Sequence, residues 1–293
     1  MRFAQIGENT IKMNTSRFPR IMIAGLSGDS GKTMISCGLL AYFREKGLNM
    51  APFKKGPDYI DSAWLEKASG VKSRNLDTYM VEQGHVRSSF LRNSISKDIS
   101  LIEGNRGLYD GFDAKGSHSS AELAKLLKCP IIIVLPAVKV TRTTAAIILG
   151  CKLFDNEANI AGVIINNIAG SRHEKIIRDS IESETGIPVI GSIPKISTDT
   201  LLPSRHLGLI TPVEYDKASQ AINEAKKIVG ANIDCEKILN IANSAPELNY
   251  DIEEQNIISE KKVKIGVFKD KAFSFYYNEN IEALEKTGAE IVW

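Results

Sequence analysis

The feature that most constrains the fold is a glycine-rich segment between an apolar run and a helical pattern. Residues 20–26, RIMIAGL, are typical of a buried strand, and apolar residues recur at helical spacing from Lys32 to Lys46. The segment from Gly25 to Thr33 reads GLSGDSGKT. Backbone N–H groups in such a turn converge on phosphate oxygens, and the N-terminus of the following helix adds a favourable dipole. The sequence therefore predicts a phosphate-binding loop.

The residue types in this loop have separate expected roles. Lys32 is expected to bridge the β- and γ-phosphates of ATP, and the Thr33 hydroxyl to ligate Mg²⁺. The spacing departs from the usual G-x-x-x-x-G-K-[ST], because five residues rather than four separate Gly25 from Gly31. The alternative is an ordinary glycine-rich turn. The residues expected to bind ATP here are Ser27, Gly28, Asp29, Ser30, Gly31, Lys32 and Thr33.

The rest of the chain alternates apolar runs with helical patterns. Residues 130–136, PIIIVLP, and 160–166, IAGVIIN, are continuous apolar runs of the kind that forms buried parallel strands. Further strands are expected at 50–53, 100–103 and 189–193, and helices at 119–128, 143–154 and 172–185. This alternation predicts an α/β fold, a doubly wound parallel sheet of the P-loop NTPase type. Ligands of such sheets bind outside the carboxyl ends of the strands.

The composition changes near residue 230. Residues 231–262 are rich in Asn, Asp, Glu and Lys, which favours a helix followed by a linker. Residues 263–293 predict a strand, a helix and a strand, a unit that cannot bury its own faces. We therefore expect an ATP-binding domain at 17–230, a helix and linker at 231–262, and the beginning of a second α/β domain at 263–293.

Composition excludes several classes of function. A net charge of +2 over 293 residues gives no electrostatic footprint for nucleic acid or a membrane surface. The longest apolar stretch, at about 129–138, is too short to span a bilayer, and the N-terminal residues show no secretion signal. The four cysteines have no metal-ligand spacing and are expected to be buried thiols of a cytoplasmic protein.

Two further segments supply charged residues suited to a nucleotide site. Residues 54–61 read KKGPDYID, and residues 103–111 read EGNRGLYDG. Glu103 ends an apolar strand, as a metal-binding acid opposite a phosphate loop should, and the glycines after it allow close backbone approach to a ligand. The alternative for both segments is a polar surface loop.

Together these segments resemble the cobyrinic acid a,c-diamide synthase family. Its members join a dethiobiotin-synthetase-like ATP domain to a C-terminal class I glutamine amidotransferase domain. The resemblance covers about residues 19–215 and resumes at 263–293, and the family's phosphate loop has the same five-residue spacing. The stretches that carry it are AGLSGDSGKT, PFKKGPDYIDSAWL, SRNLDTYM, EGNRGLYDG, AELAKLL, AGVIINNIAGSRH, IPVIGSIPK and LPSRHLGL.

The resemblance implies an ATP-dependent carbon–nitrogen ligase. A side-chain carboxylate of a tetrapyrrole attacks the γ-phosphate of ATP, and ammonia released from glutamine captures the acyl phosphate. The residues carried over by resemblance are the metal ligands Thr33, Glu103 and Asp58; the catalytic residues Asp58, Asp61, Asp110 and Lys54; the substrate contacts Lys55, Tyr59 and Arg205; and Asn166 for the adenine base. His206 accompanies Arg205 in the same motif, and a helix-capping role is the alternative for this pair.

The sequence also departs from the family. A class I amidotransferase needs a nucleophilic Cys and a distant His, and the positions of the four cysteines and four histidines fit neither. We therefore expect a chain without the glutaminase, active only with free ammonia. Residues 137–143, AVKVTRT, stand where many relatives have an Asp-containing segment, which leaves sirohaem and Ni-sirohydrochlorin open as substrates.

Other readings of the fold remain. Dethiobiotin synthetase itself shares the fold and the carboxylate phosphorylation, but lacks GPDYID followed by SRNLD. A MinD/ParA-type regulatory ATPase carries a signature lysine five residues before the loop lysine, where this chain has Ser27. A homodimer is expected by analogy with relatives.

Overall fold

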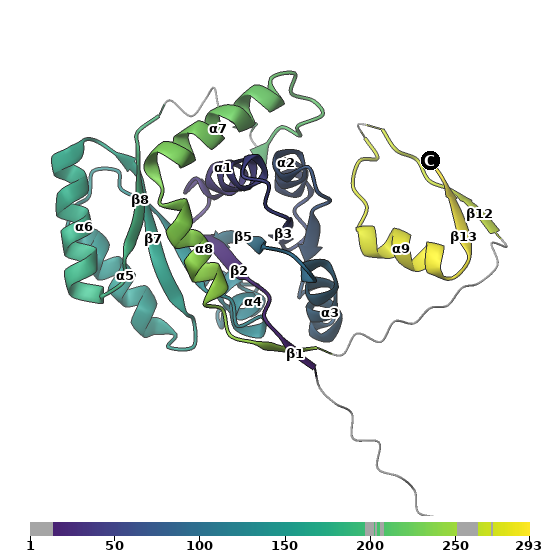
Figure 1. Cartoon of the computed structure of the whole chain (residues 1–293), viewed down its shortest axis with the longest axis horizontal. Helices are drawn as coiled ribbons and strands as arrows, with labels where there is room; N and C mark the ends of the chain where they lie inside the picture. The colour runs from purple at the N-terminus through teal and green to yellow at the C-terminus, as the bar shows by residue number, and fades with distance from the viewer. Residues whose placement is uncertain (1–13, 197–201, 203, 206–207, 251–262, 271) are drawn as a thin grey trace, which may run out of the picture.

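The computed structural model describes residues 14–196, 202, 204–205, 208–250, 263–270 and 272–293. Its main body is a sheet of seven strands with helices on both faces, as Figure 1 shows. All neighbouring strands of this sheet are parallel. In pairing order they are β4 (Arg74–Leu76), β3 (Met50–Lys55), β5 (Ile99–Gly107), β2 (Arg20–Gly25), β6 (Ile131–Pro136), β7 (Ile160–Ile168) and β8 (Val189–Pro194). The predicted fold class, a doubly wound parallel sheet, is confirmed.

Two hydrophobic cores lie on opposite faces of the sheet. Along β2, Ile21 and Ile23 belong to one core while Met22 and Ala24 belong to the other, as the two-residue period of a strand requires. The first core is covered by α1 (Lys32–Glu45), α2 (Tyr59–Ser69), α7 (Ala218–Asn232) and α8 (Cys235–Asn243). The second is covered by α3 (Gln83–Ser94), α4 (Ser120–Leu126), α5 (Thr143–Phe154) and α6 (Ser171–Thr185). Among the described residues no helix combines the length and apolar character needed to cross a bilayer.

The structure differs from the predicted elements near the acidic segments. Lys54 and Lys55 extend strand β3, and Tyr59 already begins α2, so residues 54–61 are a strand end and a helix start rather than one loop. Helix α3 was not predicted, because its sequence is largely polar. Its three main apolar side chains, Val86, Phe90 and Leu91, pack on the sheet, and this tertiary contact fixes the helix.

The segment predicted as helix and linker is more ordered than expected where it is described. Helix α8 is followed by β11 (Leu248–Tyr250), which pairs antiparallel with β1 (Asn14–Ser16). The fully buried Arg20 guanidinium joins this region to the sheet, since it donates to the carbonyls of Leu127 at 2.6 Å and Pro246 at 2.7 Å.

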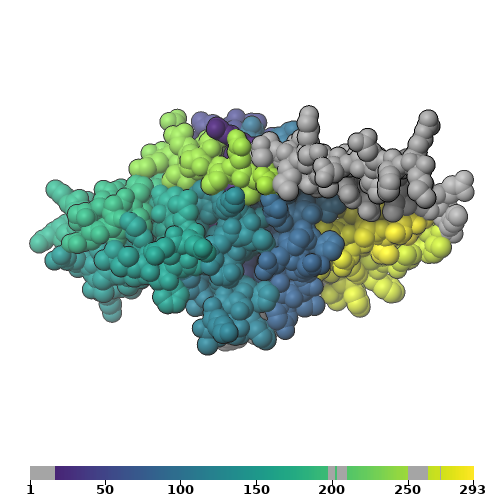
Figure 2. Space-filling view, turned by 90° about the horizontal axis from the view of Figure 1, so that it is seen from below, coloured from purple at the N-terminus to yellow at the C-terminus, as the bar shows by residue number. Residues whose placement is uncertain are grey.

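The C-terminal segment, residues 263–293, contains the predicted strand, helix and strand. Strand β12 (Val263–Gly266) pairs in parallel with β13 (Ala289–Val292), and α9 (Asn278–Lys286) connects them. Figure 2 shows this segment, in yellow, against the blue part of the main body. Its contacts with the main body include those of Arg74, which binds Glu279 and Glu282, and of Asp77, which accepts a hydrogen bond from the Tyr277 hydroxyl at 3.0 Å.

Candidate functional site

The carboxyl ends of β2, β3 and β5 bring the phosphate loop and both acidic segments together, because these three strands are neighbours. The loop folds tightly after β2. A Cβ on Gly25 would lie 2.1 Å from Ser30 Oγ, so only glycine fits there. The Lys32 ammonium turns back into the loop and donates to Ser27 O at 2.8 Å and Ser30 Oγ at 3.2 Å. The loop therefore holds its cation over its own backbone.

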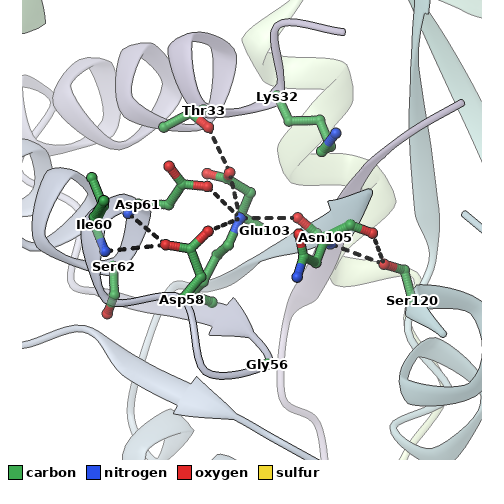
Figure 3. A network of polar contacts seen from close by, with 12 residues as sticks. Lys32, Thr33, Gly56, Asp58, Ile60, Asp61, Ser62, Glu103, Asn105 and Ser120 are labelled. Atoms are coloured by element: carbon green, nitrogen blue, oxygen red, sulfur yellow. Dashed lines mark hydrogen bonds and ion pairs between the residues drawn. The ribbon is translucent and has the colours of Figure 1, made fainter. Parts of the chain in front are cut away.

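Figure 3 shows Asp58, Asp61 and Glu103 pointing toward one another, and a buried lysine, Lys54, lies where they meet. The Lys54 ammonium is 2.6 Å from Asp61 Oδ2, 2.9 Å from Glu103 Oε1 and 3.8 Å from Asp58 Oδ2. Its third hydrogen-bond acceptor is the carbonyl of Gly104, at 3.2 Å. Lys54 and Glu103 are almost completely shielded from solvent. Two segments about fifty residues apart thus form one cluster of three carboxylates around one cation.

Burial and charge shift the pKa values in this cluster in different directions. Burial alone would lower the pKa of Lys54, but the carboxylates of Glu103 and Asp61 raise it above its ordinary value. Burial raises the pKa of Glu103 to about 7, against the opposing effect of the Lys54 ammonium. The pKa of Asp58 is raised by burial and by Asp61. The site therefore holds a permanently charged lysine beside carboxyls that can exchange protons.

Thr33 and Glu103 provide the oxygen ligands that Mg²⁺ prefers. The Thr33 hydroxyl donates to Glu103 Oε1 at 2.7 Å, while Glu103 Oε2 is buried and has no hydrogen-bond partner among the described residues. A nucleotide-bound Mg²⁺ needs only one or two such protein ligands, because phosphates and water supply the rest. No cluster of three or more His, Cys, Asp or Glu side chains suited to a metal occurs in the described part of the chain. The residues fit a nucleotide-associated ion rather than an all-protein metal cage.

Asp58 and Asp110 make local contacts that fix their positions. Asp58 caps helix α2, since its Oδ1 accepts from the N–H groups of Ile60 at 3.1 Å and Asp61 at 3.0 Å. Asp110 Oδ2 accepts from Gly107 N at 2.9 Å. Gly107 itself lies against the phosphate-loop strand, because a Cβ there would be 2.6 Å from Leu26 O. Asp110 is thus beside the phosphate loop, but no direct contact joins it to Lys54 in the described structure.

The remaining predicted residues are more dispersed. Asn166 is buried and donates from Nδ2 to Ser30 O at 3.0 Å, so its side chain supports the phosphate loop. Tyr59 is partly exposed and stacks on Phe275 of the C-terminal segment, with ring centroids 5.5 Å apart. The Lys55 side chain is half-buried near Asp77. Arg205 is described only as backbone of the short strand β9 (Ser204–Arg205), which pairs with β10 (Gly208–Leu209).

One predicted residue is not described, and three residues of the phosphate loop are exposed. His206 falls outside the described residues. In the phosphate loop, Ser27, Gly28 and Asp29 are exposed to solvent or nearly so, and Asp29 has a left-handed backbone with φ of 51°. These exposed groups border the open side of the loop.

The sequence did not single out Asp77 and Arg106 as residues at the carboxyl end of the sheet. Asp77 lies in the stretch SRNLDTYM and accepts from the backbone N–H groups of Tyr79 at 3.0 Å and Met80 at 3.2 Å. Arg106 lies in EGNRGLYDG and has a left-handed backbone with φ of 51°, an uncommon conformation for a residue with a side chain. The only sequence signal was membership of these two motifs.

Comparison with known proteins identifies the family. Residues 21–210 match CbiA, the CobQ/CobB/MinD/ParA nucleotide binding domain. The chain is 41% identical to the cobyrinate a,c-diamide synthase of Archaeoglobus fulgidus, over 97% of this chain and 62% of that protein. It is 40% identical to the enzyme of the same name from Methanobrevibacter smithii, over 93% of this chain and 60% of that protein.

A third relative, the cobyrinate a,c-diamide synthase of Magnetococcus marinus, is 37% identical over 94% of this chain and 60% of its own length. The chain thus spans about 60% of the length of these curated relatives. Among solved structures, chloroplast FtsY from Physcomitrella patens aligns with a TM-score of 0.45 and 17% identity, over 73% of this chain and 67% of that one. The family match, which covers most of the chain, shows that this protein belongs to the CobQ/CobB/MinD/ParA nucleotide-binding domain family.

Proposed function

We propose that this chain is the ATP-dependent, carboxylate-activating part of a tetrapyrrole a,c-diamide synthase. The observation that carries the proposal is the Lys54 cluster, in which a buried cation and three carboxylates adjoin a phosphate loop. A site for nucleotide hydrolysis alone needs phosphate and metal ligands, but no further buried cation shared among carboxylates. The names of the relatives, which match along nearly the whole chain, support the same reaction.

The proposed reaction has two steps. A side-chain carboxylate oxygen of the tetrapyrrole attacks the γ-phosphorus of ATP, the bond to the β-phosphate oxygen breaks, and an acyl phosphate and ADP form. Ammonia then attacks the acyl carbon, and inorganic phosphate leaves with the carbon–oxygen bond electrons. Phosphorylation is needed because a free carboxylate has no good leaving group for attack by ammonia.

Each part of the site has a proposed role in this reaction. Lys32 and the loop N–H groups bind the phosphates, and Asn166 holds the loop in shape. Lys54 stabilises negative charge on the transferred phosphoryl group and the acyl oxygen. Asp61, with Asp58, orients ammonium and accepts the proton that ammonia loses on attack.

Mg²⁺ would be held by Thr33 and Glu103, with Asp58 as a further ligand, and would offset charge on the phosphates. Asp110 is proposed to face the reacting carboxylate, and Lys55, Tyr59 and Arg205 the substrate. Asn166 is proposed to contact adenine with the second N–H of its amide, since the first is donated to Ser30 O.

The test is amide formation in a defined mixture. The chain is incubated with MgATP, ammonium chloride and, in parallel, cobyrinic acid, sirohydrochlorin, Ni-sirohydrochlorin or sirohaem. Residues 263–293 contain neither cysteine nor histidine, so ammonia is supplied directly rather than from glutamine. Mass spectrometry should show the small decrease that replacement of a carboxyl hydroxyl by an amino group gives, and the substrate that shows it identifies the enzyme.

A matched pair of variants makes the test specific. Lys32→Ala should lower turnover by at least about a hundredfold, because it removes the phosphate-loop cation. Lys46→Ala, at the other end of the same helix, removes an exposed ammonium that lies over the Tyr42 ring and should leave turnover unchanged. ATP hydrolysis without amidation of any of the four tetrapyrroles would overturn the proposal in favour of a regulatory ATPase.

A further inference from the structure

Two large exposed aromatic side chains, Tyr79 and Phe112, contact each other on the surface. Tyr79 is 56% and Phe112 71% exposed, and their rings contact each other with centroids 4.9 Å apart. Tyr79 comes from the segment after β4, and Phe112 from the segment after β5. His118 meets the Tyr79 ring edge-on at 5.5 Å. Exposed aromatic contacts of this kind are typical of binding surfaces, because removing their apolar surface from water lowers the free energy.

Hydrogen bonds hold both rings in their exposed positions. Phe112 N donates to Ser117 O at 2.8 Å, and the Asp113 carboxylate accepts from the N–H groups of Lys115 and Ser117, each at 3.0 Å. The Tyr79 backbone is held by Asp77. The rings are therefore displayed by ordered turns, and their exposure does not come from a lack of local structure.

The two segments that carry the aromatic rings begin next to the nucleotide site. Leu108 N donates to Gly25 O at 2.8 Å, so the segment that leads to Phe112 leaves directly from the phosphate loop. On the Tyr79 side, Leu76 at the end of β4 is paired with Lys55, the neighbour of Lys54 in β3. The two rings thus bridge segments that begin on either side of the acidic cluster.

Two cations lie near Asp77, the residue whose carboxylate holds the Tyr79 backbone. The half-buried Lys55 lies within electrostatic reach of both Asp77 and Arg106. Arg106 is exposed and projects from a left-handed backbone position. Within the described part of the chain, neither side chain makes a hydrogen bond or an ion pair. Half-buried or strained cations without a protein partner are suited to a ligand that brings carboxylates.

We propose that Tyr79 and Phe112 form a stacking surface for the face of the substrate macrocycle, and that Lys55 and Arg106 bind its carboxylate arms. This inference rests on the proposed function and adds to it the location of the substrate. A flat conjugated ring with carboxylates on its rim matches a flat aromatic surface with cations at its border. Single-stranded nucleic acid also combines rings with negative charge, but a net charge of +2 over the chain gives no broad basic surface for a phosphate chain.

The arrangement also explains how one arm reaches the reactive centre. Lys54 and Lys55 are consecutive in a strand, so their side chains point to opposite faces. Lys54 faces the carboxylate cluster, while Lys55 faces the Asp77 and Arg106 side. A macrocycle held on the Lys55 side can extend one carboxylate arm past β3 toward Lys54 and the phosphate loop.

The test measures tetrapyrrole binding and ATP binding separately, by isothermal titration calorimetry of the 293-residue chain. The Tyr79→Ala/Phe112→Ala double variant should bind cobyrinic acid or sirohydrochlorin about tenfold or more weakly than wild type. Its affinity for MgATP should stay within about twofold. The matched control is Phe268→Ala/Phe273→Ala, which removes another exposed aromatic pair, with centroids 5.7 Å apart, in the C-terminal segment. It should change neither affinity.

Conservative and charge variants separate stacking from a structural role. Phe112→Trp should keep tetrapyrrole affinity, since it retains a flat ring. Lys55→Met should weaken binding several-fold and make the remaining affinity less dependent on salt, because one charge pair is lost.

Four outcomes would overturn the inference. If wild type binds and amidates a tetrapyrrole but the double alanine variant binds it equally well, the stacking surface is wrong and the proposed function stands. If wild type binds no tetrapyrrole, both the stacking surface and the proposed function are wrong. If Phe112→Trp loses as much affinity as Phe112→Ala, or if the alanine variants instead dissociate a dimer of the chain, the rings pack against protein and not against a macrocycle.

Discussion

The main sheet and the C-terminal segment are built from the same unit, two parallel strands joined by a helix, yet they bury very different amounts of apolar surface. Helix α1 after β2 has ten buried residues, whereas α9 between β12 and β13 has none. Phe268 and Trp293 of the C-terminal segment are largely exposed. Parallel strands are stable when helices cover both faces, and only the main sheet meets that condition among the described residues.

The ion pairs of the two regions differ in the same way. Lys54 is surrounded by carboxylates away from water, while Arg74, which binds the C-terminal segment, pairs with a Glu282 side chain that is 40% exposed. A charge pair in water contributes little net stability, but removal of one partner from a buried cluster leaves the other charge uncompensated. Loss of a cation is therefore predicted to lower the free energy of unfolding more in the buried Lys54 cluster than at Arg74.

The largest effect is expected for Lys54→Met. It leaves Asp61 and Glu103 buried without their cation and should lower the free energy of unfolding by about 3–5 kcal/mol. Denaturant unfolding followed by circular dichroism measures this. Adding Asp61→Asn to Lys54→Met should restore part of the loss, because the carboxylate that stays ionised is removed. A change no larger than that of a surface lysine would contradict the buried cluster.

The next effect is a pH dependence. Burial raises the pKa of Glu103 from 4.5 to about 7, so the folded chain keeps a proton that the unfolded chain has already released. The free energy of unfolding should therefore fall as pH rises through this window, and Glu103→Gln should lack this decline. The difference between the two proteins should change by about 2–3 kcal/mol across the window.

Asp61→Asn provides a counter-test of opposite sign. Burial alone would raise the pKa of Asp61, but the Lys54 ammonium lowers it below its ordinary value. Its stabilising contribution is present above the unfolded-state pKa and is lost as pH falls. For the Glu103 prediction, the contradicting result is a free energy of unfolding that depends on pH in the same way in wild type and Glu103→Gln. Glu103 would then not titrate as the structure requires.

A smaller effect is expected from packing between α1 and α7. A Cβ on Gly38 would lie 2.4 Å from Val229 Cγ2 and 2.6 Å from Ala225 O, so Gly38→Ala should cost about 1–3 kcal/mol in thermal or denaturant unfolding. Gly150→Ala in α5 is the matched control. No atom lies within 4 Å of its added Cβ, and the better helix former should stabilise by up to about 1 kcal/mol. Equal effects at the two glycines would argue against the close helix contact.

The smallest effect on global stability is expected for Arg74→Met. Loss of its pairs with Glu279 and Glu282 should change the free energy of unfolding by about 1 kcal/mol or less. Hydrogen exchange should nevertheless accelerate locally in α9, because this helix has no buried residue and is held to the main body by polar contacts. If α9 stays as protected as α1 in the variant, the segment is held by more than these ion pairs.

Several site residues were predictable from sequence because they are close along the chain. The phosphate loop needs only a strand, a glycine-rich turn and a helix, and the structure has all three at the expected places. Glu103 was identified because it follows an apolar strand. Asp61 lies only seven residues after Lys54, but Glu103 could not be predicted as a partner from spacing, since it meets Lys54 only through the pairing of β3 with β5.

Asn166 and Tyr79 illustrate two reasons for incomplete prediction. Asn166 remains a prediction for the nucleotide base, and its contact with Ser30 O, which depends on how β7 lies beside β6, could not be predicted. Tyr79 could be recognised only as a member of the motif SRNLDTYM. Its exposure and its contact with Phe112 depend on two segments that are distant in sequence. Local patterns carry no information about such pairings.

The sequence by itself determined the fold class and the phosphate loop, because hydrophobic periodicity and turn chemistry act over a few residues. It also determined the family, through motifs that stand in order along most of the chain. Only the tertiary structure decided which charges share one buried site and which aromatic rings contact each other on the surface. The physical reason is that burial, and with it the strength of every charge interaction, is set by strand order and helix packing between segments far apart in the chain.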